Sequence, residues 1–267
     1  MPFRASVASC LALAALLAGC GSDDENSAAP STSPPAVESP PTVQSQAIAA
    51  PATVNVYFLR DGKVGTAKRV VVAGPQIGRA AMLELLQGPA RPERVAGLQS
   101  SIPAGTKLEQ LAIDQGVASV TLSHELDAAA TAQVVYTLTQ FDTVRGVSIA
   151  ESEPIDRAEL EDLTPPVLVE SPFPGEDVAS PLRMTGTANT FEATFNVEVL
   201  DDEGNVLGNR FVTATSGSGT RGTFDAEVSF KAPAEGPGSL MVFELSAEDG
   251  SRIHEMKIPL QISLYRG

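Results

Sequence analysis

The sequence predicts an α+β domain followed by an all-β sandwich, and three observations support this fold class. Strand-like alternation of apolar residues occurs in both halves, whereas helical spacing occurs only between residues 76 and 142. After residue 165, short strand-like runs follow one another at even spacing, separated by turns. The length of 267 residues leaves room for two domains of about a hundred residues each once residues 1–52 are set aside.

Residues 1–19 have the composition of a secretory signal peptide. Arg4 precedes an apolar stretch that is shorter than the roughly 20 residues needed to span a bilayer. The boundary Leu17-Ala18-Gly19-Cys20 resembles the bacterial lipobox. This resemblance implies cleavage before Cys20 and lipidation of its thiol, which would anchor the mature chain in a membrane. The alternative is an ordinary secretory signal that has a cysteine near its end.

Residues 20–52 are expected to form a disordered tether. The segment has four acids and no bases, and it is rich in Ser, Ala and Pro. Such a composition cannot bury enough apolar surface to offset the loss of chain entropy on folding. We therefore expect the folded part to stand away from the membrane.

Residues 53–150 combine strand and helix patterns. Apolar residues alternate in expected strands at 54–59, 68–72, 108–113, 117–123 and 146–150. Two segments, 76–87 and 127–142, have one apolar helical face each, and Gly88-Pro89 ends the first. The order ββαββαβ predicts an α+β domain with helices on one face of a sheet.

Four motifs in this domain resemble those of the GerMN family. They are Leu83 to Pro89 (LELLQGP), Leu98 to Thr106 (LQSSIPAGT), Ile113 to Ser123 (IDQGVASVTLS) and Val135 to Phe141 (VYTLTQF). The family is named for sporulation and spore germination proteins. The resemblance implies an extracytoplasmic module that contacts protein or cell wall, and it brings no catalytic residue with it.

Residues 165–267 have the pattern of an immunoglobulin-like sandwich. Residues 151–164 form a strongly acidic segment before this domain, which we expect to be a solvated linker. Beyond it, strands are expected at 182–188, 193–200, 206–213, 222–230, 240–247 and 253–260. Short strands without a helical period indicate a sandwich, although the Cys and Trp of antibody domains are absent here.

The second domain resembles the immunoglobulin-like, Gmad-type domain that follows GerMN in bacterial lipoproteins. The residues that carry this resemblance are Ser171 to Gly175 (SPFPG), Gly186 to Phe191 (GTANTF), Gly222 to Phe224 and the final strand. Domains of this type present edges and loops for binding, so the resemblance implies an interaction module.

Charge and cysteine content exclude several classes of partner and site. The net charge of -15 repels nucleic acid phosphates and anionic lipid head groups, so we expect no nucleic acid partner. The two cysteines, Cys10 and Cys20, both lie in the first twenty residues. The folded part therefore has no thiol for a disulfide, a zinc-thiolate site or a nucleophile.

Some patterns match chemical sites but lack the context that such sites need. Gly217 to Gly222 (GSGTRG) matches the dinucleotide-binding pattern, but a strand follows it where a helix is required, which favours a flexible hairpin. His124 and Glu125 have no second histidine at zinc spacing, and His254 stands alone. Structural or solvent-facing histidines explain them better.

Two groups of acids also match chemical sites only in part. For the first group, a solvated linker is favoured over a paired-carboxylate glycosidase site. For the second group, a tight turn is favoured over a calcium loop. The residues concerned are Glu151, Glu153, Asp156, Glu159, Glu161 and Asp162 in the linker, and Asp201, Asp202, Glu203 and Asn205 around Gly204. We therefore predict no catalytic residue, no metal site and no small-molecule cofactor.

These observations predict a lipid-anchored, non-catalytic binding or assembly module on the extracytoplasmic face of a bacterial cell membrane. Its expected partner is an envelope protein. Peptidoglycan binding is one alternative, because the first domain is nearly neutral and carries the basic residues Arg91, Arg94 and Lys107. A cell-wall hydrolase of the amidase type, which would use His124 or Glu125, is the least favoured alternative.

Overall fold

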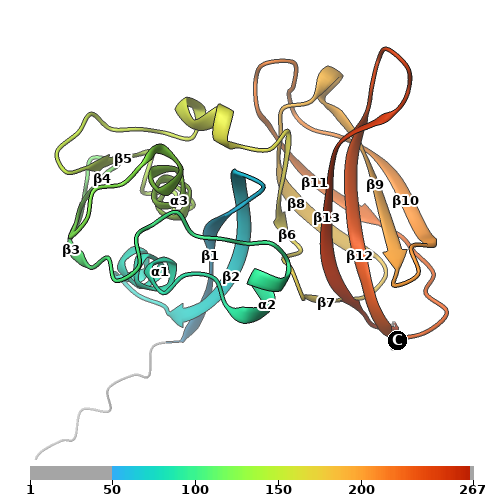
Figure 1. Cartoon of the computed structure of the whole chain (residues 1–267), viewed down its shortest axis with the longest axis horizontal. Helices are drawn as coiled ribbons and strands as arrows, with labels where there is room; N and C mark the ends of the chain where they lie inside the picture. Colours follow the sequence, from blue (N-terminus) through green and yellow to red (C-terminus); the bar gives the residue numbers. More distant parts are fainter. Residues whose placement is uncertain (1–49, 265–267) are drawn as a thin grey trace, which may run out of the picture. The chain divides into compact units, whose positions relative to one another are not determined.

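The computed structural model describes residues 50–264, and it confirms an α+β domain followed by an all-β domain (Figure 1). The predicted signal peptide, Cys20 and the predicted tether up to residue 49 lie outside the described residues. Among the residues described, no helix is both long enough and apolar enough to cross a bilayer.

The first domain begins with a β-hairpin. β1 (Pro51–Arg60) starts inside the expected tether and pairs along its whole length with β2 (Lys63–Val72). Asp61 and Gly62 connect them with φ angles of 52° and 75°. Positive φ at both central positions is the geometry of the type I′ turn, which suits the right-handed twist of the flanking strands.

The remaining elements of this domain follow the predicted order, with one addition. They are α1 (Ile77–Leu86), α2 (Arg91–Val95), β3 (Leu108–Asp114), β4 (Val117–Leu122), α3 (Ala128–Leu138) and β5 (Gly146–Ile149). The short helix α2 was not predicted. Its first turn is stabilised by the Glu93 carboxylate, which accepts a hydrogen bond from the Ala90 N–H at 2.6 Å.

The strands of the first domain form two sheets where the pattern indicated one. β1 and β2 make a two-stranded sheet, and β3, β4 and β5 make a three-stranded sheet. Helices α1 and α3 contact strands of both sheets. Their buried side chains, such as Met82, Leu85 and Leu138, share one core with Tyr57 and Val120. Each sheet thus packs on the same pair of helices.

The second domain is a sandwich of two sheets. The three-stranded sheet has the order β11-β8-β6, and the five-stranded sheet has the order β10-β9-β12-β13-β7. The strands are β6 (Val167–Ser171), β7 (Asp177–Val178), β8 (Leu182–Ala188), β9 (Thr194–Asp201), β10 (Val206–Thr213), β11 (Gly222–Val228), β12 (Gly236–Leu245) and β13 (Arg252–Ile262). Side chains from both sheets, including Met184, Phe195 and Leu240, form its core. Strands β6 and β7 were not predicted.

The expected solvated linker is only partly solvated. Most of its acids are exposed, as predicted, but it also contains the 3-10 helix η1 (Ala158–Leu163), in which Leu160 is buried. Thr164 is buried as well and accepts or donates a hydrogen bond with the Tyr136 hydroxyl at 2.6 Å. The segment is therefore packed against the first domain, because its few apolar and neutral positions face inward.

Candidate functional site

The two domains are joined by a polar cluster around the Arg157 guanidinium. Arg157 forms an ion pair with Glu170 of β6 at 3.0 Å, and it donates hydrogen bonds to Thr139 Oγ1 at 2.8 Å and to the Tyr136 carbonyl at 3.1 Å. The Tyr57 hydroxyl donates to the same Glu170 carboxylate at 2.5 Å. The guanidinium also lies 4.5 Å from the Tyr136 ring centre and 5.3 Å from that of Tyr57. One cation thus ties β1, α3 and β6 together.

Burial determines the electrostatics of this cluster. Loss of solvent, reinforced by the Glu170 charge, raises the pKa of Tyr57 far above its ordinary value. Burial also raises the pKa of Tyr136. Burial by itself lowers the pKa of Arg157, but Tyr57 and Glu170 outweigh it and raise the value overall. Both tyrosines therefore stay neutral and the arginine stays charged throughout the physiological range.

A second ion pair joins η1 itself to the second domain. Arg221 donates two hydrogen bonds, both of 2.9 Å, to the Glu161 carboxylate, and a third of 2.8 Å to the Pro165 carbonyl. Asn189 adds a hydrogen bond of 2.7 Å to Glu161. The hydrogen bonds from Arg221 lower the pKa of Glu161 below its usual value. Glu161 is the one acid of the expected linker that enters a bidentate pair, so it fixes η1 to the second domain.

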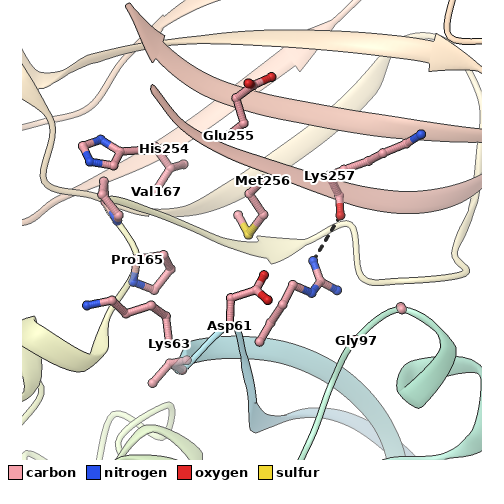
Figure 2. Close-up of a pocket in the computed structure, with 13 residues that line it drawn as sticks. Asp61, Lys63, Gly97, Pro165, Val167, His254, Glu255, Met256 and Lys257 are labelled. Carbon is pink, nitrogen blue, oxygen red and sulfur yellow. Dashed lines mark hydrogen bonds between the residues drawn. The ribbon is translucent and has the colours of Figure 1, made fainter. Parts of the chain in front are cut away.

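A cleft of about 440 Å³ lies between the β1–β2 turn and strand β13 (Figure 2). Its lining residues come from four separate segments: Arg60, Asp61, Lys63 and Val64; Ala96 and Gly97; Pro165, Pro166 and Val167; and His254, Glu255, Met256 and Lys257. Figure 2 shows Asp61 and Lys63 on the hairpin, opposite Met256 and beside Pro165. The cleft therefore combines charged side chains with an apolar wall.

The Arg60 guanidinium is the least solvated charge in this cleft. Its Nη1 donates to the Lys257 carbonyl at 3.2 Å, whereas its buried Nε has no hydrogen-bond partner. Its stem passes Gly97, where a side chain would meet the Arg60 Cγ at 3.8 Å. Burial lowers the pKa of Arg60, and the neighbouring Asp61 charge opposes this effect. Arg60 therefore keeps donor capacity that the residues from 50 to 264 do not use.

His254 borders the cleft in an unusual backbone conformation. The register between β12 and β13 shifts here, so that two residues of β13, His254 and Glu255, lie opposite Phe243 alone. His254 has a φ of 53°, which is uncommon outside glycine. Its Nδ1 lies 2.8 Å from the carboxylate of Glu244, a buried residue. The sequence predicted an isolated histidine on a late strand, whereas the structure pairs His254 with Glu244.

An apolar patch covers β2 and α1 in the first domain. Val70, Val72 and Leu83 are 69%, 66% and 45% exposed, and together with Pro51 and Ala80 they border a depression of about 510 Å³. We call these five residues the β2–α1 patch. Exposed apolar residues that lie side by side can form a binding surface.

His124 and Glu125, the residues that a hydrolase would use, do not form a catalytic arrangement with other described side chains. His124 Nδ1 lies 3.1 Å from Ser123 Oγ and 3.5 Å from Thr106 Oγ1. Both His124 and Glu125 are exposed. No carboxylate within the described part of the chain is hydrogen-bonded to the imidazole, so the orienting acid of a triad is missing there.

The remaining sequence candidates have structural roles. The Gly217 to Gly222 loop leads into β11, as expected, but it is packed and not free, because Ser218 N–H donates to the Thr190 carbonyl at 2.9 Å. Asp201 accepts two hydrogen bonds from Asn205, at 2.7 and 2.9 Å, which stabilise the turn and lower the pKa of Asp201. Between residues 50 and 264, no group of three or more metal-ligating side chains is found.

Two family models match the chain. Residues 55–154 match the model described as sporulation and spore germination (Germane). Residues 166–251 match the model described as the immunoglobulin-like domain of bacterial spore germination (Gmad2). These matches confirm both resemblances and their order, and Arg157 lies in the short segment between them.

Solved structures overlap the chain in part. The tandem GerMN domains of the sporulation protein GerM from Bacillus subtilis match with 19% identity and a TM-score of 0.34, over 43% of this chain and 49% of that one. The first GerMN domain of the same protein matches with 19% identity and a TM-score of 0.32, over 39% and 94%. CopC from Methylosinus trichosporium OB3b matches with 16% identity and a TM-score of 0.24, over 38% and 97%. The chain thus spans about half the length of the tandem structure, and none of the curated proteins matches it.

The buried tyrosines of the junction predict a specific response to alkaline pH. In the unfolded chain tyrosine ionises near pH 10, whereas the pKa values of Tyr57 and Tyr136 are raised in the folded state. The unfolded state then binds fewer protons above pH 10, so stability falls as pH rises, by up to about 1.4 kcal/mol per pH unit for each tyrosine. We expect tyrosinate absorbance to show two of the three tyrosines titrating only as the protein unfolds.

The control for this titration is the chain unfolded in urea, in which all three tyrosines should ionise together near pH 10. Ionisation of all three near that pH in the folded protein would contradict the buried junction.

Proposed function

The chain joins a sporulation and spore germination (Germane) domain to an immunoglobulin-like (Gmad2) domain of bacterial spore germination, and from this pairing we propose that it is a non-catalytic docking module of the bacterial envelope. Its partner in this proposal is another envelope protein. The matched families are sporulation and germination domains, and neither is described as an enzyme family. The pairing gives a germination-type module, and the surface suggests what the module does.

The β2–α1 patch is the observation that carries this proposal. Arg69 and Glu84 stand beside the patch and pair with each other at 3.5 Å. Arg69 also forms an ion pair with Glu93, a buried residue, so one cation is shared by two carboxylates. An occupant that covers three exposed aliphatic side chains beside one paired carboxylate is a mainly apolar surface, and in a secreted protein this favours a protein partner.

The surroundings of His124 in the described structure favour a non-catalytic role. A hydrolase needs a nucleophile or activated water, a base and an oxyanion site in mutual reach. Around His124, the described residues supply only hydroxyl neighbours. We therefore favour a binding role over catalysis for the surface around His124.

We propose further that lipid on Cys20 holds the module at the outer face of the cell membrane. The leader, the four residues that resemble a lipobox and the Pro-rich segment after them support this assignment. One acyl chain binds a membrane only marginally, so the two or three chains that lipoproteins carry are needed for firm anchoring.

Peptidoglycan is the second candidate partner. The basic residues of the protein that could bind it are distributed over two segments. Arg91 and Arg94 lie on α2, and Lys107 lies before β3. All three are exposed. Cosedimentation of the purified protein with wall sacculi, lost when all three are replaced by Gln, would favour this candidate over the protein partner.

Site-specific photo-crosslinking tests the docking proposal. A photoreactive amino acid at Leu83, introduced in intact cells, should give one adduct of defined mass with an envelope protein. The double replacement Val70→Asp and Val72→Asp should abolish that adduct, because two carboxylates would be desolvated against an apolar partner. Val95→Asp is the matched control, since Val95 is 83% exposed but stands outside the patch on α2.

An adduct that survives the double replacement, or the absence of any adduct at Leu83, would argue against docking through this patch.

Replacement of the lipidated residue tests the anchor. We expect Cys20→Ser to move the protein from the membrane fraction to the soluble extracytoplasmic fraction and to leave the leader uncleaved or cleaved elsewhere. The measurement is immunoblotting of fractionated cells, with Cys10→Ser as the control because Cys10 lies inside the predicted leader. Unaltered fractionation and processing of Cys20→Ser would rule out the lipid anchor.

A further inference from the structure

The cleft of Arg60 is bordered by a free strand edge. Strand β13 pairs with β12 on one side, but on its other side it pairs with β7 only at Gln261 and Ile262. The carbonyl groups of Lys257 and Pro259 face away from β12. The Lys257 carbonyl accepts a hydrogen bond from Arg60, and the Pro259 carbonyl accepts one from the Gly175 N–H. The edge of β13 before residue 258 therefore has no strand partner in the described chain.

Main-chain groups on such an edge can pair with an extended peptide. Peptide recognition by strand addition uses main-chain hydrogen bonds for affinity and side-chain pockets for selection. The bulge at His254 ends the regular edge on one side, and the contact of Gly175 with Pro259 ends it on the other. The edge between these limits is a few residues long, and a volume of about 440 Å³ is within the range of ligand pockets. The Lys257 carbonyl already accepts from Arg60, and Pro259 has no N–H, so a segment here would gain few main-chain hydrogen bonds and would be held mainly by the side chains of the cleft.

The charges in the cleft select for an acid. The Arg60 guanidinium makes one hydrogen bond in the described structure, from Nη1 to the Lys257 carbonyl, and it forms no ion pair there. Lys63 is also without a carboxylate partner there, since its ammonium donates to the main-chain carbonyl of Asp162. Figure 2 shows the side chains of Glu255 and Lys257 directed away from Asp61, which leaves Asp61 as the acid that faces the cleft. A ligand carboxylate would thus find two cations and one competing acid.

The apolar wall distinguishes a peptide from a small anion. Pro165, Pro166, Val167 and Met256 line the cleft beside the charges, and Met256 packs on the core of the second domain. A free phosphate would leave this wall unused, whereas aliphatic side chains on either side of an acidic residue would cover it.

We propose that the cleft binds an extended acidic peptide segment of the partner protein, with its carboxylate on Arg60 and its main chain along the edge of β13. This inference rests on the proposed docking function and adds the chemistry of the segment that is recognised. Arginine suits the role because its planar donors bind a carboxylate in two places at once.

Binding to two matched peptide arrays tests this proposal. The probes are pentapeptides with Glu at the centre and Ala, Val, Leu or Pro at the other positions, and the same set with Gln at the centre. The purified protein should bind members of the Glu set at least about tenfold more tightly than their Gln counterparts, as expected for a charge-assisted hydrogen bond. Arg60→Gln should weaken binding to the Glu peptides by a similar factor.

A second variant, Asp61→Asn, is expected to tighten binding where Arg60→Gln weakens it, and a gain in affinity cannot result from misfolding. Asp61→Asn removes the competing carboxylate and keeps the turn, because Asn followed by Gly is favoured in a type I′ turn. It should bind the Glu peptides several-fold more tightly and leave the Gln peptides unchanged. Arg183→Gln is the distant control, since Arg183 pairs with Asp225 on an exposed surface of β8 and β11, and it should change neither affinity.

Equal affinity for the two arrays, no binding to either, or full binding by Arg60→Gln would overturn the proposal. Preferential binding of soluble peptidoglycan fragments over every peptide would overturn it as well. If the Leu83 adduct persists while the arrays fail, the cleft proposal falls and the docking function stands. If the adduct also fails, the docking function itself is contradicted.

Discussion

The interaction of Arg157 with Glu170, Tyr57 and Tyr136 is the constraint on which the rest of the structure depends. Glu170 belongs to the second domain and the tyrosines to the first, so the ion pair and the ring contacts cross the junction. Removing one partner of a poorly solvated pair leaves the other charge uncompensated, which is far more costly than losing an exposed pair. The cleft has one wall from each domain, and its shape therefore depends on this junction.

Local patterns predicted most of the fold, because each strand and long helix has its own periodicity. The limits of β8 and β10 match the expected 182–188 and 206–213. Helix α2 was missed because a five-residue helix stabilised by Glu93 has no measurable period. The packing of η1 was missed for a different reason, since a run of acids conceals the single buried Leu160.

The candidate site was much less predictable than the fold. Arg60, Gly97, Pro165 and Met256 are far apart in the sequence, and none belongs to a motif that pattern reasoning can detect. The pairing of His254 with Glu244 depends on a bulge that alternation does not reveal. Motifs with local chemistry, such as the turn around Gly204, were interpreted correctly because their hydrogen bonds are local.

Spin-label distance measurement between the domains tests the central claim most directly, that the Arg157 junction holds both domains in one arrangement. With Cys10 and Cys20 both replaced, labels on Val95→Cys and Phe211→Cys would be the only ones, because the sequence has no other cysteine. The account predicts a single narrow distance distribution that broadens in Arg157→Gln and stays narrow in Arg183→Gln. A broad distribution in the protein with Arg157 intact would contradict it.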